Sequence, residues 1–328
     1  MKKILVLLSI LLTFSLNAIA DRSDEKNDEK KDKKKKPIYY RLNQKFGTNV
    51  SHIYRMTEKT KVVRYYEDSS KYEYEREYTY FFKLRASSDY DSDGYQTIKV
   101  SIDSLHYYFK DKDAEFSTVT RLGVKKPKHY DLTKTFAINA LEFQYRFSRY
   151  FDVAAISGEM IEWNREYVTN PRTAPRKEFN RELYQKRYSN ETLKHLSDLG
   201  KNVLPAVEVE KDSVWTSELN LDINQTSFKG YVNSRMTSLR SESYMLESDI
   251  NNMEIKDKKY RLEDLKKFAT IDSSNIKGNM QYKLHFLGRF EFVEAKVKAI
   301  LYGKVSAFNF REEIEQETVW DLLNAYRY

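Results

Sequence analysis

Three aspartates at alternate positions are followed by a glycine in residues 89–94 (DYDSDG). Carboxylates in this pattern open the calcium-binding loop of EF-hands, where the glycine allows a sharp turn. That loop also needs a glutamate at its twelfth position, where this chain has Val100. The segment therefore has two interpretations: a calcium site at Asp89, Asp91 and Asp93, or an acidic hairpin turn, which the missing ligand favours.

A second candidate site is a row of tyrosines, Tyr72, Tyr74, Tyr78 and Tyr80, here called the tyrosine ladder. Their spacing places them on one face of a β-strand, with Arg76 interrupting the row. Aromatic rings on a sheet bind sugars, peptides or bases by stacking. The same spacing is typical of cross-strand aromatic packing in a core or along a groove, which is the simpler interpretation.

Motifs of the common catalytic classes are missing from the sequence. Neither a G-x-S-x-G nucleophile motif nor a G-x-x-x-x-G-K-[ST] phosphate loop occurs, and zero cysteines exclude thiolate chemistry. His195 and His285 have no partner at catalytic spacing, so they are predicted to be packing or surface residues. Carboxylate pairs such as Glu159 and Glu162 leave a hydrolase open as an alternative, because sequence does not give their separation in space.

The elements that position these residues follow a period of two, which indicates β-strands. Residues 72–84 show it best, with mainly aromatic and apolar side chains on one face and mainly charged ones on the other. Further strands are expected at 53–66, 95–103, 151–156, 159–163, 215–223, 280–286 and 293–301. Most are sequential neighbours, so the sequence predicts a mainly β fold of antiparallel meander sheets, as a sandwich or a curved, half-barrel-like sheet.

A short helical insert is expected between two β-rich halves. Phe179, Leu183 and Arg187 recur every four residues and predict one short helix. Leucines at 193, 196 and 199 recur every three and predict a second helix that stops at Gly200. A further short helix is expected at 257–268. The 159–163 strand is expected to form a tight hairpin with 151–156 through Ser157-Gly158.

The N-terminus has the three parts of a secretory signal peptide. Lys2 and Lys3 form the basic region, residues 4–16 form the apolar region, and Ala18-Ile19-Ala20 is a small-x-small cleavage site. The apolar region is shorter than the roughly 20 residues that a membrane-spanning helix needs. We therefore expect cleavage after Ala20, with Ala18 and Ala20 as the recognised residues, and no transmembrane helix.

The chain after the predicted signal peptide divides into segments of different composition. Residues 21–36 contain no apolar residue and are expected to form a disordered, charged tether. The formal net charge is +8, half of it in the signal peptide and the tether, so the body gives no reason to expect a nucleic acid partner. The expected organisation is a signal peptide (1–20), a tether (21–36), a first β-rich half (37–164), a helical insert (165–205) and a second β-rich half (206–328).

Two segments carry a resemblance to a family, namely residues 156–161 (ISGEMI) and 204–215 (LPAVEVEKDSVW). They resemble an uncharacterised family of exported bacterial β-rich proteins, in which a glycine-centred hairpin precedes a proline-containing segment and an Asp-Ser-Trp strand start. This chain departs from the family pattern in having Lys211 at a glycine position and Val214 before Trp215. The resemblance implies an exported, mainly β protein and supplies no activity, cofactor or site residue.

The sequence thus predicts an exported, non-enzymatic protein, periplasmic or extracellular, with a binding or structural role and an aromatic-rich sheet surface. Its expected partner is a glycan, a lipid or another cell-envelope component, and no cofactor is expected apart from the calcium alternative. The aromatic C-terminal segment, with Trp320, Leu322, Tyr326 and Tyr328 alternating, leaves an outer-membrane β-barrel as an alternative. The 32% content of charged residues argues against such a barrel.

Overall fold

The computed structural model describes residues 37–120, 129, 141–148, 153–201, 203–224, 226–262 and 264–327. The chain divides into two units, Met1–Pro37 and Ile38–Tyr328, and the description below concerns the second. The predicted signal peptide, with Ala18 and Ala20, and the predicted tether lie outside the described residues. Their assignment therefore stays a prediction.

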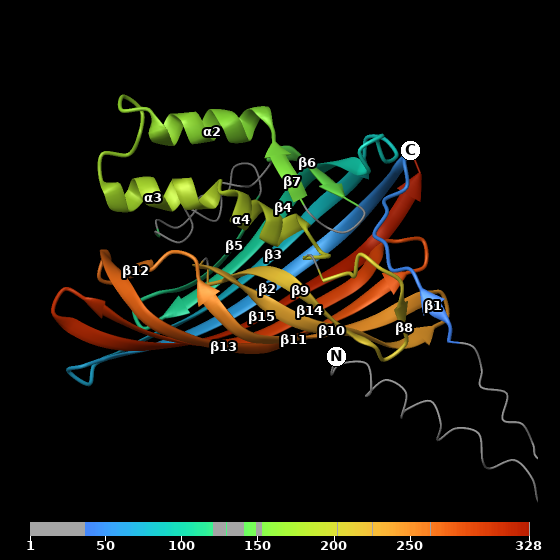
Figure 1. Ribbon diagram of the computed structural model, residues 1–328. Helices are drawn as coiled ribbons and strands as arrows, with labels where there is room; N and C mark the ends of the chain where they lie inside the picture. Colours follow the sequence, from blue (N-terminus) through green and yellow to red (C-terminus); the bar gives the residue numbers. More distant parts are fainter. Residues whose placement is uncertain are drawn as a thin grey trace, which may run out of the picture. The chain divides into compact units, whose positions relative to one another are not determined.

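The second unit is built mainly from long β-strands, with a group of helices between two series of strands (Figure 1). The strands are β1 (Tyr39–Tyr40), β2 (Val50–Tyr66), β3 (Lys71–Ala86), β4 (Tyr95–Asp111), β5 (Glu115–Val119), β6 (Glu142–Ser148), β7 (Val153–Ser157), β8 (Val209–Glu210), β9 (Val214–Ile223), β10 (Thr226–Arg240), β11 (Ser243–Ile255), β12 (Lys259–Leu262), β13 (Lys267–His285), β14 (Phe290–Val305) and β15 (Phe308–Arg327). The helices are α2 (Glu159–Thr169), α3 (Glu178–Arg187) and α4 (Asn190–Ser197).

One 13-stranded sheet contains nearly all the strands, and β1 and β8 form a separate pair. Its order is β7-β6-β4-β3-β2-β15-β14-β13-β11-β10-β9, with β5 paired to β4 and β12 to β13. These strands pair antiparallel, mostly with their sequential neighbours, as in a meander. The predicted fold class, a mainly β antiparallel meander with a short helical insert between two β halves, is confirmed.

The sheet is open, because its end strands β7 and β9 are not paired with each other in the described part of the chain. The alternative of a closed β-barrel is therefore wrong as an architecture. The C-terminal strand β15 is not the closing strand of a barrel. It lies in the middle of the sheet, between β2 and β14. Of its alternating residues, Trp320 is fully buried, Leu322 is half-buried and Tyr326 is exposed, so the alternation does not mark one buried face up to the end of the strand.

Alternation fixes which face of each strand is buried. On β2 the even-numbered residues from 54 to 64 are buried, and their odd-numbered neighbours are exposed or half-buried. The buried set gives the sheet an inner face that carries most of the large side chains of the core, including Tyr54, Tyr80 and Phe82. Each fully buried ring or large aliphatic group stabilises the fold by about 1.5–3 kcal/mol.

The sheet also curves back over its own inner face (Figure 1). Asn224, directly after β9, lies against strands near the centre of the sheet. Its side-chain oxygen accepts hydrogen bonds from Tyr74 Oη and Arg76 Nη2, each at 2.9 Å. Its backbone N–H donates to Gln316 Oε1 at 2.7 Å. The first and second β halves therefore share one interior, which contains polar as well as apolar groups.

Two segments differ from their predicted structure. Residues 159–163 are not a strand but the first turns of α2, which starts directly after Gly158. The spacing of Ile161 and Val168, both buried, suits one face of a helix, and alternation over so few residues cannot distinguish the two structures. Ser157 ends β7, so Ser157-Gly158 is a strand-to-helix junction rather than a hairpin tip.

The second difference is at 257–268, where the predicted helix is absent. The described residues of this segment include β12, a turn at 264–266 and the start of β13, with which β12 pairs. By contrast, α3 and α4 occur where two short helices were predicted. The second helix ends earlier than the predicted stop at Gly200: α4 ends at Ser197, so Leu193 and Leu196 lie in it and Leu199 follows it, and all three leucines are buried. Ser189 caps α4 by accepting from the N–H of Thr192.

Among the described helices, none has both the length and the apolar composition required for crossing a membrane.

Candidate functional site

The tyrosine ladder lies on the inner face of β3, and all four of its side chains are buried. The predicted aromatic surface is therefore an interior surface rather than an exposed strip. Tyr72 and Tyr74 line a cavity of about 430 Å³, here called the large cavity. Tyr78 and Tyr80 line a gap of about 20 Å³ beneath α4. The rings are packed in the interior, and Tyr72 and Tyr74 also face a space that a ligand could occupy. The predicted binding role of the ladder stays a prediction.

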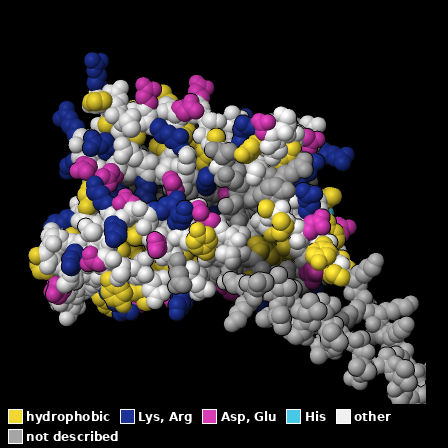
Figure 2. All heavy atoms as spheres, in the orientation of Figure 1, with side chains coloured by type: hydrophobic (Ala, Val, Ile, Leu, Met, Phe, Trp, Pro, Cys, Tyr) yellow, Lys and Arg dark blue, Asp and Glu magenta, His cyan; other side chains and the backbone are white. Residues whose placement is uncertain are grey.

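The large cavity lies between the α3–α4 segment and the inner sides of β2, β3, β10 and β12. Its aromatic lining comes from Tyr72, Tyr74, Tyr260 and Phe268. Its charged lining comes from Arg64, Glu182, Lys186, Arg187, Glu191, Lys256, Asp257, Lys259 and Arg261. Exposed residues such as Lys256 and Gln185 belong to this lining, so the cavity reaches the surface. Figure 2 shows cations and acids side by side on the face drawn there, without a region of one sign.

A buried ion-pair cluster supports the floor of the large cavity. Arg64 Nε donates to Glu312 Oε2 at 2.6 Å, and Arg64 Nη1 donates to Asp264 Oδ1 at 2.5 Å. Tyr66 donates to Asp264, and Tyr260 donates to Glu312. Arg64 and Glu312 are 2% and 0% exposed, so this pair lies in a low-dielectric interior, where a lone charge is costly.

A second buried cluster lies under α4 and centres on Glu58. Its Oε2 lies 2.6 Å from Nε2 of His195, 3.2 Å from Nε2 of Gln316 and 3.4 Å from Oγ1 of Thr318. Strand alternation places Glu58 on the inner face of β2, and α4 carries His195 to it from 137 positions later in the chain.

The charge of Glu58 is stabilised by these surroundings. Burial alone opposes ionisation of the carboxyl group. The interactions with His195, Arg76 and Arg187 outweigh that effect and hold the pKa of Glu58 below its ordinary value. Arg187, at the end of α3, also donates a hydrogen bond to the hydroxyl group of Tyr80, which ties the helical insert to the tyrosine ladder.

Lys201 completes the cluster from the loop after α4. Its Nζ lies 3.4 Å from the carbonyl oxygen of His195 and 4.9 Å from the ring centre of Trp320. The residue is 5% exposed. Burial lowers the pKa of Lys201 to about 8, although Asp198, Asp222 and Glu58 act in the opposite direction.

This lowered pKa predicts a pH-dependent stability that a Lys201→Met variant should lack. Between pH 8 and 10.5 the unfolded chain holds a proton on Lys201 that the folded chain has lost, so stability rises with pH in this window. Relative to the Met variant, the wild type should gain about 2 kcal/mol of unfolding free energy between pH 7.5 and 9.5. Urea unfolding at both pH values measures this gain, and a constant difference between the proteins would contradict it.

The three aspartates of the predicted calcium loop lie in the hairpin between β3 and β4. Asp89 pairs with Lys45 at 3.3 Å, and Asp91 accepts hydrogen bonds from the backbone N–H groups of Asp93 and Tyr95. In the described part of the chain, no group of three His, Cys, Asp or Glu side chains is placed to hold a metal ion. This arrangement is the acidic hairpin turn, and the calcium interpretation finds no support in it.

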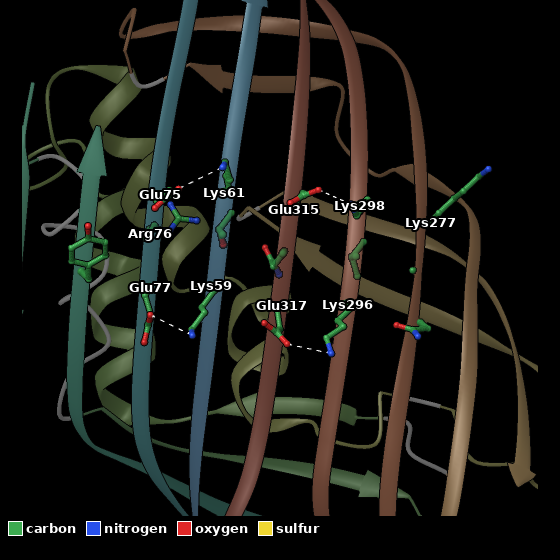
Figure 3. Close-up of a pocket in the computed structure, with 16 residues that line it drawn as sticks. Lys59, Lys61, Glu75, Arg76, Glu77, Lys277, Lys296, Lys298, Glu315 and Glu317 are labelled. Atoms are coloured by element: carbon green, nitrogen blue, oxygen red, sulfur yellow. Dashed lines mark hydrogen bonds and ion pairs between the residues drawn. The ribbon is translucent and has the colours of Figure 1, made fainter. Parts of the chain in front are cut away.

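The outer face of the sheet contains a wide depression of about 710 Å³ over β3, β2, β15, β14 and β13 (Figure 3). Its charged side chains pair across neighbouring strands: Lys61 with Glu75, Lys59 with Glu77, Lys298 with Glu315, and Lys296 with Glu317. Such exposed pairs contribute about 0–1 kcal/mol each. We interpret this surface as a solvated outer face and place the candidate site on the inner face.

The remaining sequence candidates have structural roles. His285, predicted to be a packing or surface residue, is buried and lies 3.0 Å from Glu242. Glu159 and Glu162 are exposed in the first turn of α2. Sequence reasoning missed Glu58 and Asp222, because their partners His195 and Thr192 are distant in the chain. It also missed Lys201, whose burial no spacing rule indicates. The one available signal was Arg76, a charge in the apolar row of β3.

The inner-face cluster has the elements of acid–base chemistry as well as of binding. A carboxylate that orients an imidazole is the arrangement by which enzymes hold a general base. Aromatic rings beside paired charges equally suit recognition of a polar ligand with apolar faces. The geometry alone therefore accommodates both the predicted binding role and the hydrolase alternative.

Comparisons with known proteins do not identify a family. No family model and no curated protein matches the sequence. A structure of lipovitellin, concerned with its lipid–protein interactions, aligns with 86% of this chain at 9% identity and a TM-score of 0.39, and the chain spans only 26% of that protein's length. The translocator domain of the autotransporter NalP from Neisseria meningitidis aligns with 86% of this chain and 90% of its own at 8% identity and a TM-score of 0.19. OpdQ from Pseudomonas aeruginosa aligns with 82% of this chain and 98% of its own at 7% identity and a TM-score of 0.19. Structural similarities with such low sequence identities and TM-scores do not support a functional assignment.

Proposed function

We propose that this chain is an exported binding protein that encloses a polar ligand with apolar faces in the large cavity. The observation that carries the proposal is the cavity itself: about 430 Å³ lined by four aromatic rings and by charged side chains from both β halves and the helical insert. This volume lies in the range of about 300–1,000 Å³ that is typical of small-molecule sites.

The cost of the surrounding charges supports the same proposal. Arg64, Glu58 and Glu312 are each at most 4% exposed. Buried ion pairs of this kind often stabilise a protein less than apolar side chains of similar volume would. Arg64 lines the large cavity and pairs with Glu312, and Glu58 lines the gap beneath α4. Charges buried beside these spaces are better explained by recognition of a ligand than by stability.

The cellular location in this proposal rests on the sequence. The signal-peptide pattern of residues 1–20 and the resemblance to exported bacterial β-rich proteins both favour export to the periplasm or beyond it. A glycan, a lipid or another envelope component is then the expected ligand class. The helical insert would cover the ligand, and the tyrosine ladder would contact its apolar faces.

Native mass spectrometry of the exported protein, together with a glycan array and a lipid array, tests the proposal. Gln185→Trp enlarges an exposed side chain in the lining of the large cavity and should weaken binding at least tenfold. Gln281→Trp makes the same change on the exposed face of β13 and should have no effect.

Two results would contradict a binding role in this cavity. One is the absence of any retained or array-bound compound in both ligand classes. The other is equal binding by the wild type and Gln185→Trp, which would place the ligand elsewhere. Release of a chemically altered compound would instead support the hydrolase alternative.

A further inference from the structure

A group of apolar side chains is exposed at the end of the sheet where β13 turns into β14. Phe286 and Leu287, in that turn, are 45% and 69% exposed, and Leu239, at the end of β10, is 39% exposed. Ile38, directly before β1, is 66% exposed. Figure 2 shows hydrophobic side chains on this end of the molecule, near the position of β1 and β8 in Figure 1. We call these four residues the apolar tip.

Two half-buried tyrosines connect the members of the apolar tip. The ring centre of Tyr244 lies 4.7 Å from that of Phe286 and 6.0 Å from that of Tyr40. Tyr244 is also the cross-strand partner of Leu239, so both side chains point to the same side of the sheet. Tyr40 follows Ile38 by two positions, and an extended chain places such a pair on one side. The four exposed side chains therefore share an aromatic base.

The turn between β13 and β14 holds Phe286 and Leu287 in place. The backbone N–H of Phe286 donates to the carbonyl oxygen of Glu242 at 2.8 Å. The N–H of Leu287 donates to Nδ1 of buried His285 at 3.0 Å, and that of Gly288 donates to the carbonyl oxygen of His285 at 2.8 Å. A turn with its N–H groups satisfied in this way is ordered. The exposure of the two apolar side chains is therefore a built feature of the fold.

The size of the apolar tip indicates what kind of partner it contacts. With full side-chain areas of about 150–200 Å² each, the exposed parts of the four residues amount to on the order of 400 Å². Exposed apolar patches of this size are often functional. A stable protein–protein interface takes about 800 Å² from each partner, so the apolar tip is too small to hold a second protein by itself. A lipid layer requires no complementary shape, because apolar side chains insert among its mobile acyl chains.

The chemical composition of the apolar tip also favours a lipid surface. Aliphatic and phenyl side chains form its exposed part, and the hydroxyl-bearing rings of Tyr40 and Tyr244 lie at its base. Proteins place apolar and tyrosine side chains in this order across a membrane–water boundary. The exposed charges of the neighbouring β10–β11 turn, Arg240 and Glu242, have opposite signs. Docking would therefore depend on apolar insertion rather than on attraction to charged lipid.

We propose that the apolar tip docks this protein reversibly on a lipid bilayer, with Phe286 and Leu287 inserted among the acyl chains. The inference goes beyond the proposed function, because it concerns a surface at the end of the sheet and not the contents of the large cavity. The exposed apolar area is comparable to that of one acyl chain, so the expected association constant is on the order of 10⁴ M⁻¹.

Flotation of the exported protein with vesicles of pure phosphatidylcholine is the first test. These vesicles have no net charge, so the four lysines at 33–36 contribute little to binding. Leu287→Asp should lower the association constant at least tenfold, because it replaces an inserted leucine by a charge. Leu265→Asp is the matched control. Leu265 is 41% exposed and precedes β13 by two positions, as Leu287 follows it by two, and its variant should bind like the wild type.

The lack of cysteine in the chain permits a direct measurement of insertion. Leu287→Cys and Leu265→Cys each introduce a single thiol, to which an environment-sensitive nitrobenzoxadiazole dye is attached. Phosphatidylcholine vesicles should shift the emission of the dye at position 287 to shorter wavelength, and nitroxide-labelled lipid should quench it. The dye at position 265, at the other end of β13, should show neither effect.

Lack of flotation of the wild type would overturn the proposal, and so would equal binding by the wild type and a Leu287→Asp protein that circular dichroism shows to be folded. A dye at position 287 that vesicles leave unchanged would do the same. Dimerisation in light scattering that Leu287→Asp abolishes, without vesicle binding, would assign the apolar tip to a contact between copies and overturn docking on lipid. These outcomes are separate from those of the proposed function, because retention of a ligand and its loss in Gln185→Trp depend on the large cavity.

Discussion

Replacement of Arg64 by methionine is expected to lower the free energy of unfolding by about 3–5 kcal/mol. The variant would leave Glu312 fully buried without the guanidinium group that pairs with it, and Asp264 would lose the same partner. Methionine fills much of the arginine volume, so the loss comes mainly from the uncompensated charge. Urea unfolding at pH 7 measures the effect.

The outer face of the same strand supplies the control. Lys61→Met breaks the exposed pair with Glu75 at 3.7 Å and should change stability by no more than about 1 kcal/mol. The double variant Arg64→Met/Glu312→Leu should recover about 2 kcal/mol or more relative to the sum of its single variants, because it removes both charges together. Additive effects of the two substitutions would show that the pair is not coupled.

Replacement of Gly278 by valine should cost about 3 kcal/mol or more, or prevent folding. Gly278 lies within β13, opposite Val297 of β14, at a position where the strands approach closely. A Cβ atom at this position would lie 2.2 Å from the carbonyl oxygen of Lys296 and 3.0 Å from the Cα atom of Val297. Both obstacles are backbone atoms, so the sheet itself would have to move.

Asn279→Val is the matched control for this glycine. It places the same side chain one position later on the exposed face of β13, where valine suits a strand, and should leave stability within about 0.5 kcal/mol. Gly278→Ala should be intermediate between wild type and Gly278→Val in thermal unfolding. A Gly278→Ala protein as stable as the wild type would show that the strands accommodate a side chain at this approach.

Strand positions and faces could be predicted from the sequence because a period of two is a local property. The alternation at 72–84 correctly assigned the tyrosine ladder and its neighbours to one face of β3. It could not show that this face is interior, because that depends on the sheet folding back over it. Where alternation covered only a few residues, as at 159–163, a helix formed instead, stabilised by burial of Ile161 and Val168.

The polar interior could not be predicted for a different reason. Glu58 meets His195 across 137 positions, and Arg64 meets Glu312 across 248. Spacing rules compare residues within one element, so they treat each of these charges as isolated. Arg76 in the apolar row of β3 was the visible exception, and its partner Asn224 lies in the other β half.

The central position of β15 determines when the sheet can assemble. The strands that are synthesised before β15 belong to two separate groups. One group has β2 as an unpaired edge strand, and the other has β14. Residues 308–327 join these edges, and they emerge after every other described strand. The two β halves therefore cannot join into one sheet before β15 has been synthesised, and the edges of β2 and β14 stay unpaired until then.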